Sequence, residues 1–573
     1  MEDITVKSKS KSSRVTDIVG ILCGLLLVVI GVVTAISANA GRTAGLPESQ
    51  IPATAKTFTG KADGRNGEIA VQVIADKDKI YQVKVLSEEE TKGIGTLAVK
   101  NVPKMIYDNQ SLSVDGVSGA TVTSEAIGQA VFNALKQGEA DGIDVYRFNV
   151  IRVNKAAQAV PVPTSVGTIT VEEWKANNEN WLENHPEVDP ATYADAYPEI
   201  YASFMANEEN ADHPDYLEEY PQLKTLYAGY PFSYDYDEAR GHTYVIDDVT
   251  ATDRLHKKLA DGSLNPEIFQ KANCFTCKTP VMAAIANDTD GAAYSWAFEQ
   301  MQELVADIPV GCYTCHGDTP GELTITHTYL TASVGDNFSQ IDGANLACGQ
   351  CHNEYFFMPG TNCTTLPHNS LASMSPDAML HYYNTDQSIL KTEEDGSKVP
   401  FYDYVNKISG VKVIKVQHPE LETFLGEGSV HRGKFTCADC HMSRNLEGPN
   451  GTTLANHKLT NPQDNEWLVE NTCSKCHANL EAEIKAIQDK ADARTREVAD
   501  LLVSLHEQIG AAAEAGTLPA DQLAEVRSIV RDAQFYWDFV FVENSNGAHN
   551  SKLTFYCLDT AEKLANEALA LLP

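Results

Sequence analysis

Hydrophobic and polar positions change their spacing several times along the chain, and each change predicts an element. Residues 68–75 and 80–86 alternate apolar and polar side chains, which predicts two β-strands. Residues 124–135 repeat apolar positions at helical spacing and predict an amphipathic helix. Residues 479–515 and 520–541 show the same spacing and predict two long helices, which pack either in a core or at an interface.

The N-terminal pattern is of another kind. Residues 18–38 are uncharged and mostly apolar, and they follow a polar, basic stretch at residues 1–17. A helix of this length spans about 30 Å, one bilayer core. Its basic flank stays cytoplasmic, which sends the rest of the chain outside. A cleaved signal peptide is the alternative, because Ala38-Asn39-Ala40 has the form of a cleavage site. Both interpretations place the bulk of the chain on the extracytoplasmic side.

Composition narrows the class of protein. The 573 residues suggest three or four structural units, and an apolar share of 43% is enough for sizeable cores. The formal net charge is −35, so the chain lacks the large basic surface that nucleic-acid binding needs. An anionic substrate would therefore require a local cationic pocket.

Ten of the 13 cysteines form five C-x-x-C pairs, and four of these pairs are followed directly by histidine. C-x-x-C-H is the attachment sequence of c-type haem. Zinc is the alternative, but zinc sites combine two pairs, so five pairs leave one over, and zinc needs no histidine directly after each pair. The four complete motifs are Cys312–Cys315–His316, Cys348–Cys351–His352, Cys437–Cys440–His441 and Cys473–Cys476–His477.

The first pair differs from the others, because Lys278 follows Cys274 and Cys277 where histidine is expected. A lysine amine binds iron only when it is deprotonated, so this haem is chemically distinct and is the best candidate for an open coordination position. The remaining histidines are numerous enough to give the other four haems a second ligand each. A saturated iron only passes electrons. Four such haems beside one open haem indicate a multi-electron reductase.

The order of one C-x-x-C-K motif and four C-x-x-C-H motifs resembles the pentahaem, ammonia-forming cytochrome c nitrite reductase family. The similarity extends from about Tyr197 to the C-terminus. It includes the blocks at 228–233 and 238–242, the Asn353-Glu354-Tyr355 run and the K-x-Q-H-P-E block at 415–420. The resemblance implies reduction of nitrite to ammonium, and a homodimer through the C-terminal helices.

The same resemblance implies roles for individual residues. Lys278 would be the proximal ligand of the catalytic haem, and Arg254, Tyr355 and His418 would line the substrate pocket. A calcium ion would be bound by Glu354, the main-chain oxygens of Tyr355 and Lys415, and Gln417. The distal haem ligands would be His242 for the haem on His352, His457 for that on His316, His549 for that on His441 and His431 for that on His477.

Residues 115–124 read DGVSGATVTS and precede the predicted helix. Small residues and hydroxyls are common in ordinary loops and N-caps, but they also permit a ligand to approach closely. The segment resembles the flavinylation motif of the FMN-binding domain in the C subunit of sodium-pumping NADH:quinone reductases. That resemblance implies FMN joined through its phosphate to Thr121, with Thr123 as the second choice.

The predicted architecture is a multidomain chain. It has a cytoplasmic tail (1–17), a single-pass membrane anchor (18–38), an α+β FMN-binding domain (45–152), a linker (153–175) and a mainly helical pentahaem domain (176–573). We expect electrons from a quinol- or flavin-linked membrane donor to pass through FMN to the haems. Two alternatives remain: a flavocytochrome that only transfers electrons, and a reductase of sulfite or hydroxylamine on the same fold.

Overall fold

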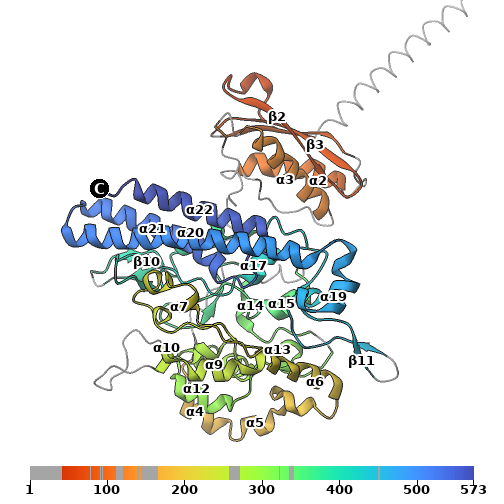
Figure 1. Cartoon of the computed structure of the whole chain (residues 1–573), viewed down its shortest axis with the longest axis vertical. Coiled ribbons are helices and arrows are strands. Elements are labelled where there is room, and N and C mark those ends of the chain that lie inside the picture. Colours follow the sequence, from red (N-terminus) through yellow and green to blue (C-terminus); the bar gives the residue numbers. More distant parts are fainter. Residues whose placement is uncertain are drawn as a thin grey trace, which may run out of the picture. The chain divides into compact units, whose positions relative to one another are not determined.

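The computed structural model describes much of the chain, and Figure 1 shows its elements. It divides into two compact units, residues 1–152 and 153–573, which are described separately. The predicted membrane segment and residues 115–119 of the flavin motif lie outside the described part. The described residues are 42–573 without 78, 89, 91, 93, 94, 111, 113–119, 139–141, 144–165, 257–270, 322, 335–340, 394 and 449–451.

The first unit is a four-stranded antiparallel sheet with the strand order β1-β4-β3-β2. Alternate residues of β3, such as Ile69, Val71 and Val73, are fully buried, as the period-two pattern predicts. Gly60 lets α3 approach β2, because a Cβ there would lie 2.0 Å from the Ala130 carbonyl oxygen. The elements are β1 (Thr43–Gly45), β2 (Lys56–Asp63), β3 (Glu68–Ala75), β4 (Ile80–Ser87), α2 (Gly95–Asn109) and α3 (Thr121–Lys136), with the short η1 (Glu48–Gln50).

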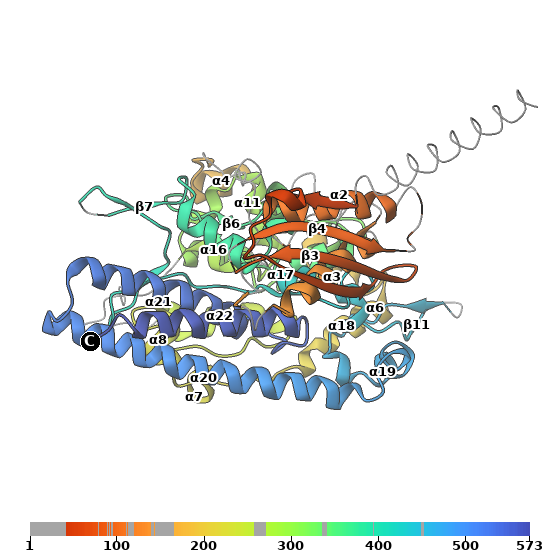
Figure 2. The same ribbon diagram turned by 90° about the horizontal axis from the view of Figure 1, so that it is seen from above.

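The second unit is mainly helical and is dominated by three long helices, α20 (Leu480–Ala515), α21 (Ala520–Phe541) and α22 (Ser551–Leu569). The three helices lie side by side in both views (Figures 1 and 2). Their packing follows the apolar spacing: Val498, Leu502 and Leu505 of α20 are fully buried, and α22 buries Leu558 and Ala561. The buried Trp537 of α21 donates from Nε1 to the Thr495 carbonyl oxygen of α20 at 2.8 Å.

Short helices carry the cysteine motifs: η10 (Ala272–Phe275), α13 (Cys312–His316), α15 (Gly343–Gly349), α18 (Cys437–His441) and η16 (Cys473–Lys475). The last part of the expected linker, from Val171, forms α4, which begins with a Thr170–Glu173 capping box. The other α-helices are α4 (Val171–Asn177), α5 (Trp181–Asn184), α6 (Pro198–Met205), α7 (Tyr216–Glu219), α8 (Leu223–Leu226), α9 (Val245–Ala251), α10 (Asp253–His256), α11 (Pro280–Asp288), α12 (Phe298–Val305), α14 (Thr328–Val334), α16 (Pro376–Thr385), α17 (Glu420–Leu425) and α19 (Glu466–Asn471).

In the described part of the second unit, the strands are only two residues long and pair as four small antiparallel ladders. Helices therefore supply most of the framework that holds the motifs. Among the residues that the structure describes, we find no helix with both the length and the apolar character to cross a bilayer. The ladders are β5 (Phe356–Phe357) with β6 (Thr364–Thr365), β7 (Lys391–Thr392) with β8 (Lys398–Val399), β9 (Tyr404–Val405) with β10 (Lys412–Val413), and β11 (Leu446–Glu447) with β12 (Thr453–Leu454).

Candidate active site

The four histidines of the C-x-x-C-H motifs each face a second histidine from a distant part of the chain. Two metal–imidazole bonds of about 2 Å, with half of each ring added, place ring centroids roughly 6 Å apart. The observed separations therefore suit one iron between the rings of each pair. They are 6.1 Å for His242–His352, 6.3 Å for His316–His457, 6.0 Å for His431–His477 and 6.0 Å for His441–His549.

Several of these rings are oriented by an oxygen acceptor at Nδ1. The Nδ1 atom of His549 lies 2.5 Å from Glu543 Oε1, and that of His477 lies 2.6 Å from Glu483 Oε2. Nδ1 of His441 lies 3.0 Å from the Thr460 carbonyl oxygen, and Nδ1 of His457 lies 3.0 Å from the Ala455 carbonyl oxygen. An N–H on Nδ1 leaves the Nε2 lone pair available, which is the tautomer that a metal-binding imidazole requires.

The third motif lies at the centre of the cysteine arrangement. Its Cys351 lies close enough to Cys277 of the first motif that the contact lowers the pKa of Cys277, and its Cys348 lies similarly close to Cys437 of the fourth motif, which lowers the pKa of Cys348. The Cys437 backbone N–H donates to Asn345 Oδ1 of α15 at 2.9 Å, which fixes α18 against α15. The second motif joins through Cys315, which lies within electrostatic range of Cys348. The fifth motif joins through Cys473, because burial and then the charge of Cys473 raise the pKa of Cys440 in the fourth motif. The five motifs thus form a continuous series.

The first motif carries a lysine and has a cationic environment. The Lys278 backbone N–H donates to the Phe275 carbonyl oxygen at 3.0 Å, and the buried Phe275 ring stacks on Phe298. Burial raises the pKa of the neighbouring Cys274 thiol to about 11, while the charges of Arg254 and Lys278 lower it. Both side chains therefore lie near Cys274. Arg254 supplies the local positive charge that an anionic substrate needs, because an iron-bound lysine amine is neutral.

Arg254 is positioned by α10. Its backbone N–H donates to Asp235 Oδ2 at 2.5 Å, and its guanidinium lies 5.0 Å from the centre of the Phe232 ring. Burial raises the pKa of Tyr355 well above its usual range, and the nearby Cys277 and Cys274 raise it further. The structure therefore brings Arg254 and Tyr355 to the first cysteine motif.

His418 lies between Lys278 and an acidic residue that the sequence analysis did not single out. Burial lowers the pKa of His418, the Glu420 carboxylate raises it and the Lys278 charge lowers it. Glu420 Oε1 is 3.9 Å from His418 Nδ1 and 3.8 Å from His352 Nδ1, and it accepts from Asn544 Nδ2 at 2.5 Å. Its position two residues after His418 was the available signal, but only the fold brings it to His352.

Glu354 occupies the place predicted for calcium and is completely buried. Its Oε1 accepts from the Tyr383 hydroxyl at 2.8 Å, and its Oε2 accepts from the Gln417 backbone N–H at 2.6 Å. Burial raises the pKa of this carboxyl well above its usual range. A buried carboxylate is costly without a cation, so the residue suits a hard cation. Gln417 Nε2 donates to the Lys415 carbonyl oxygen at 3.0 Å, so these two expected calcium-binding residues are neighbours.

The Lys415 side chain is directed away from this group of oxygens, so only its main-chain oxygen is available there. The Nζ atom donates to the Val416 carbonyl oxygen at 2.6 Å, lies 3.5 Å from Asp538 Oδ2 and sits 5.1 Å from the centre of the Tyr227 ring. In the described part of the chain, no three His, Cys, Asp or Glu side chains converge as a metal cluster. The expected calcium site contains one carboxylate, one amide and two main-chain oxygens, so it does not require three such side chains.

In the first unit, the structure distinguishes the two candidate threonines. Thr123 is buried, and its hydroxyl donates to Glu90 Oε2 at 2.5 Å. Glu90 Oε1 in turn accepts from the Asn66 backbone N–H at 3.1 Å. Thr121 is the first residue of α3, and its side chain is outside the described set. The Thr123 hydroxyl is therefore already engaged in the core of this unit.

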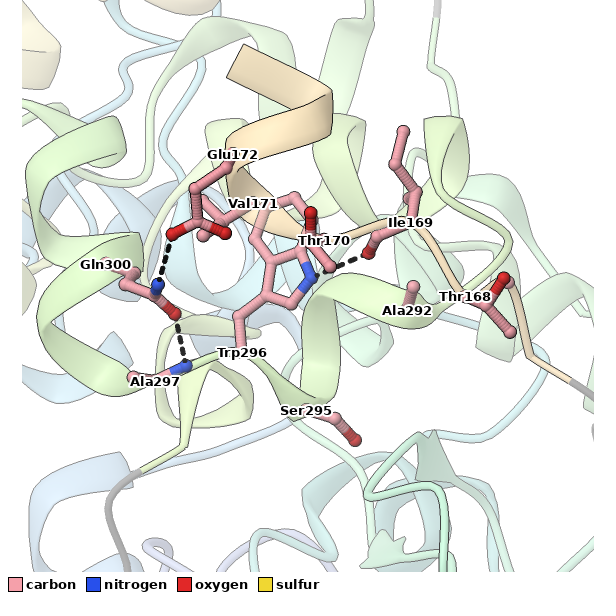
Figure 3. A pocket seen from close by; sticks show the side chains of 11 residues that line it. Thr168, Ile169, Thr170, Val171, Glu172, Ala292, Ser295, Trp296, Ala297 and Gln300 are labelled. Carbon is pink, nitrogen blue, oxygen red and sulfur yellow. Dashed lines mark hydrogen bonds between the residues drawn. The ribbon is translucent and has the colours of Figure 1, made fainter. Parts of the chain in front are cut away.

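A pocket of about 370 Å³ lies at the start of α4 (Figure 3). Trp296 Nε1 donates to the Ile169 carbonyl oxygen at 3.2 Å, and Gln300 Nε2 donates to Glu172 Oε1 at 3.1 Å. None of the lining residues is one of the predicted haem, substrate or calcium residues. We therefore assign the chemistry to the cysteine motifs and not to this pocket.

Repeated haem motifs, paired histidines and a flavin-type domain define a multihaem c-type cytochrome with an N-terminal flavin module. Residues 189–573 match the model of the cytochrome c552 family, and residues 64–136 match that of the FMN-binding domain. The first match spans more than half of the chain, so the protein belongs to the cytochrome c552 family. This confirms the predicted fusion of the two kinds of domain.

Named relatives agree with this family. The chain is 31% identical over 426 residues to a cytochrome c-552 of Aliarcobacter butzleri, covering 70% of this chain and 77% of the relative. It is 29% identical over 423 residues to the cytochrome c nitrite reductase subunit NrfA of Nitratidesulfovibrio vulgaris, covering 67% and 78%. A solved structure is also similar: the catalytic subunit NrfA of the Desulfovibrio desulfuricans cytochrome c nitrite reductase, described with two calcium sites, at 29% identity and a TM-score of 0.58. That match covers 67% of this chain and 86% of the other.

Proposed function

We propose that this protein reduces nitrite to ammonium at a c-type haem held by Cys274, Cys277 and Lys278. The observation that carries the proposal is the contrast between this motif and the other four. Each of the four histidines faces a second histidine at 6.0–6.3 Å, whereas Lys278 lies in a niche with Arg254, Tyr355 and His418 around it. Two of the relatives carry the name nitrite reductase, which supports the same substrate.

The haems, when bound, supply the reducing electrons and one coordination position for the substrate nitrogen. Nitrite takes up six electrons and eight protons to give ammonium and two waters. The Arg254 guanidinium holds the anion by charge-assisted hydrogen bonds. His418 donates protons, and the Glu420 carboxylate, 3.9 Å from its Nδ1, favours the protonated form of the ring. The Tyr355 hydroxyl, whose pKa is raised, stays protonated and donates a further hydrogen bond.

Calcium bound by Glu354, the main-chain oxygens of Tyr355 and Lys415, and Gln417 would fix the backbone that carries Tyr355. The support is the buried Glu354 carboxylate, which has hydrogen-bond donors but no cationic partner among its hydrogen-bond contacts. A divalent cation would lower the pKa of this carboxyl group and so favour its ionised form. The ion would therefore balance the charge of Glu354 and fix the position of the Tyr355 backbone.

FMN would be carried on Thr121. The Thr123 hydroxyl is buried and bonded to Glu90, so a phosphoester there would break a core hydrogen bond and displace packed atoms. A covalent flavin cannot diffuse away, which suits a domain outside the cytoplasm. We further propose that residues 18–38 anchor the chain in the membrane and that a quinol- or flavin-linked donor reduces the flavin. Contacts between two copies through α20–α22 would form a homodimer.

The direct test uses the purified full-length chain with reduced viologen and nitrite. Stoichiometric ammonium is the expected product. Consumption of nitrite without ammonium would contradict the proposal. Intact-mass analysis should count five haems and one FMN. Light scattering of the detergent-solubilised protein reports the dimer.

An electron-transfer module is the competing function, and the same sample separates it. Such a module has every haem saturated, so cyanide leaves its absorption spectrum unchanged. The proposed enzyme binds cyanide at one haem. Parallel assays with hydroxylamine and sulfite establish which small oxidised substrate the pocket prefers.

A further inference from the structure

Three of the five cysteine motifs are connected through the same position within each motif, which is the residue immediately before the second cysteine. These residues are Thr276 in the first motif, Thr314 in the second and Gln350 in the third, and all three are buried. The Gln350 amide nitrogen donates to the Thr314 carbonyl oxygen at 2.7 Å. The second and third motifs are therefore tied directly through one side chain.

His327 extends this connection to the first motif. Its Nε2 lies 2.8 Å from the Thr276 carbonyl oxygen, and its Nδ1 lies 2.8 Å from Gln350 Oε1. A carbonyl oxygen only accepts, so the proton on Nε2 is donated to Thr276. Gln350 Oε1 also accepts, and the donor to it is the His327 backbone N–H at 3.2 Å. The ring is buried and is separated from Thr276 by 51 positions in the sequence. His327 thus connects the lysine-bearing motif, through its ring, to the third motif, through its backbone.

Neighbouring groups fix the orientation of the Gln350 amide. Its Oε1 accepts from the backbone N–H groups of Thr326 at 3.1 Å and His327 at 3.2 Å, and its Nε2 donates to the carbonyl oxygens of Thr314 and Ala347. The Thr326 hydroxyl also donates to the Thr314 carbonyl oxygen at 3.1 Å. Two backbone donors on one end and two carbonyls on the other leave a single assignment of the amide.

We propose that His327, held by Gln350, is a positioning residue that sets the Lys278 motif relative to the second and third haems. The proposal rests on the proposed function, because it assumes that Lys278 binds the catalytic iron. His327 touches neither substrate nor haem ligand directly. It acts by fixing the carbonyl of Thr276, which is two residues before Lys278.

The physical reason is the cost of an unpaired buried carbonyl. Removing the imidazole leaves the Thr276 carbonyl in the interior without this partner, and it would seek a new one by shifting its loop. A small displacement of the lysine changes its bond to the metal and the haem-to-haem spacing. Second-sphere partners of this kind typically change metal-site properties by about 10- to 100-fold when lost.

The chain contains a matched control outside the haem motifs. His506 of α20 is also completely buried and also pairs with a glutamine, because its Nε2 lies 2.8 Å from Gln534 Oε1 of α21. Its Nδ1 lies 2.7 Å from Ser409 Oγ. Loss of this pair removes a similar buried network, but one that joins helices and not haem loops.

The experiment compares His327→Gln, His327→Asn and His506→Asn in the haem-loaded full-length protein. Glutamine places its amide nitrogen near the former Nε2 and keeps the bond to Thr276, whereas asparagine is too short to reach that carbonyl. We expect His327→Asn to shift the midpoint potential and the cyanide affinity of the one open haem, and to lower kcat by about 10-fold with KM for nitrite little changed. His327→Gln should stay close to wild type, and His506→Asn should lower only the melting temperature.

Unchanged potential, cyanide affinity and kcat in His327→Asn would overturn the positioning role. Equal changes in His327→Asn and His506→Asn would also overturn it, since the effect would then be general destabilisation. If His327→Asn yields no holoprotein, the His327→Gln protein decides, because its potential must match wild type if the Thr276 bond is what matters. A wild-type protein with no cyanide-binding haem would instead refute the proposed function itself.

Discussion

The Lys278 motif and the four histidine motifs use the same cysteine spacing but differ in what faces them. Each motif histidine has a histidine opposite, with ring centroids 6.0–6.3 Å apart. The lysine motif instead has Arg254 near Cys274, Tyr355 near both of its cysteines and His418 near Lys278. Such groups can bind anions and move protons. The comparison teaches that the cysteine motif is uniform, whereas the residues that face each motif differ.

The supporting contacts differ in the same way. The rings of His441, His457, His477 and His549 are fixed by an oxygen at Nδ1 within 3.0 Å. The lysine loop is held through its backbone, by the Phe275 carbonyl at Lys278 and by His327 at Thr276. A flexible side chain with one charged end requires a fixed loop, because its own stem does not orient it.

Replacing the lysine should produce the largest effect. Lys278→Leu removes the proposed iron ligand of the first motif, and we expect ammonium formation to fall by at least ~100-fold, since loss of a ligand exceeds loss of a second-sphere partner. Lys475→Leu is the control, because Lys475 is an exposed lysine inside the fifth motif. Ammonium production by both variants is measured with reduced viologen. Equal activity in the two variants would remove the distinction between the motifs.

Loss of the Arg254 charge should have the next largest effect. Arg254→Leu removes charge-assisted hydrogen bonds worth about 1.5–3 kcal/mol, which lowers kcat/KM for nitrite by about 10- to 100-fold. Arg496→Leu is the control, because Arg496 also lies over an aromatic ring, 3.8 Å from the centre of Tyr220, but belongs to α20. Steady-state kinetics measure the effect. An unchanged kcat/KM in Arg254→Leu would exclude this arginine from the pocket.

The sequence is sufficient for elements whose pattern is local. The strands at 68–75 and 80–86 and the helices at 124–135, 479–515 and 520–541 are confirmed within a few residues. Helix α2 was not predicted, and it contains the interior Pro103, which sequence rules disfavour. Strand β2 was also missed, because five of its eight residues are exposed and its apolar pattern is weak.

The site residues also divide into those that a local pattern predicts and those that it does not. The cysteine motifs are readable because each is five consecutive residues. The pairing of distant histidines needed a family resemblance, and the geometry now places those rings opposite one another. Glu420 and His327 escaped prediction because their neighbours come from separate segments: His352 for the first, Thr276 for the second. Only folding creates those contacts.

The calcium position offers a smaller effect on the same pocket. Glu354→Gln removes the buried carboxylate, and we expect calcium binding to be lost and kcat to fall by about 10-fold, because the backbone at Tyr355 loses its support. Asp377→Asn is the control: this carboxylate also accepts two tyrosine hydroxyls, from Tyr536 at 2.7 Å and Tyr556 at 2.6 Å. Metal analysis after chelation, with activity before and after calcium is restored, checks the prediction. Full activity in a calcium-free Glu354→Gln protein would contradict it.

The smallest expected loss of activity comes from opening one of the saturated sites. His431→Ala removes the ring that faces His477 at 6.0 Å, so the haem on His477 should acquire a free position. Cyanide titration should then detect a second binding haem, and turnover should fall less than in any variant above, because Arg254, Tyr355 and His418 are untouched. His213→Ala is the control, since His213 faces Asp237 and not a motif histidine. A titration that still ends at one haem would mean that His431 does not occupy the position opposite His477, and the division into one open and four saturated haems would have to be redrawn.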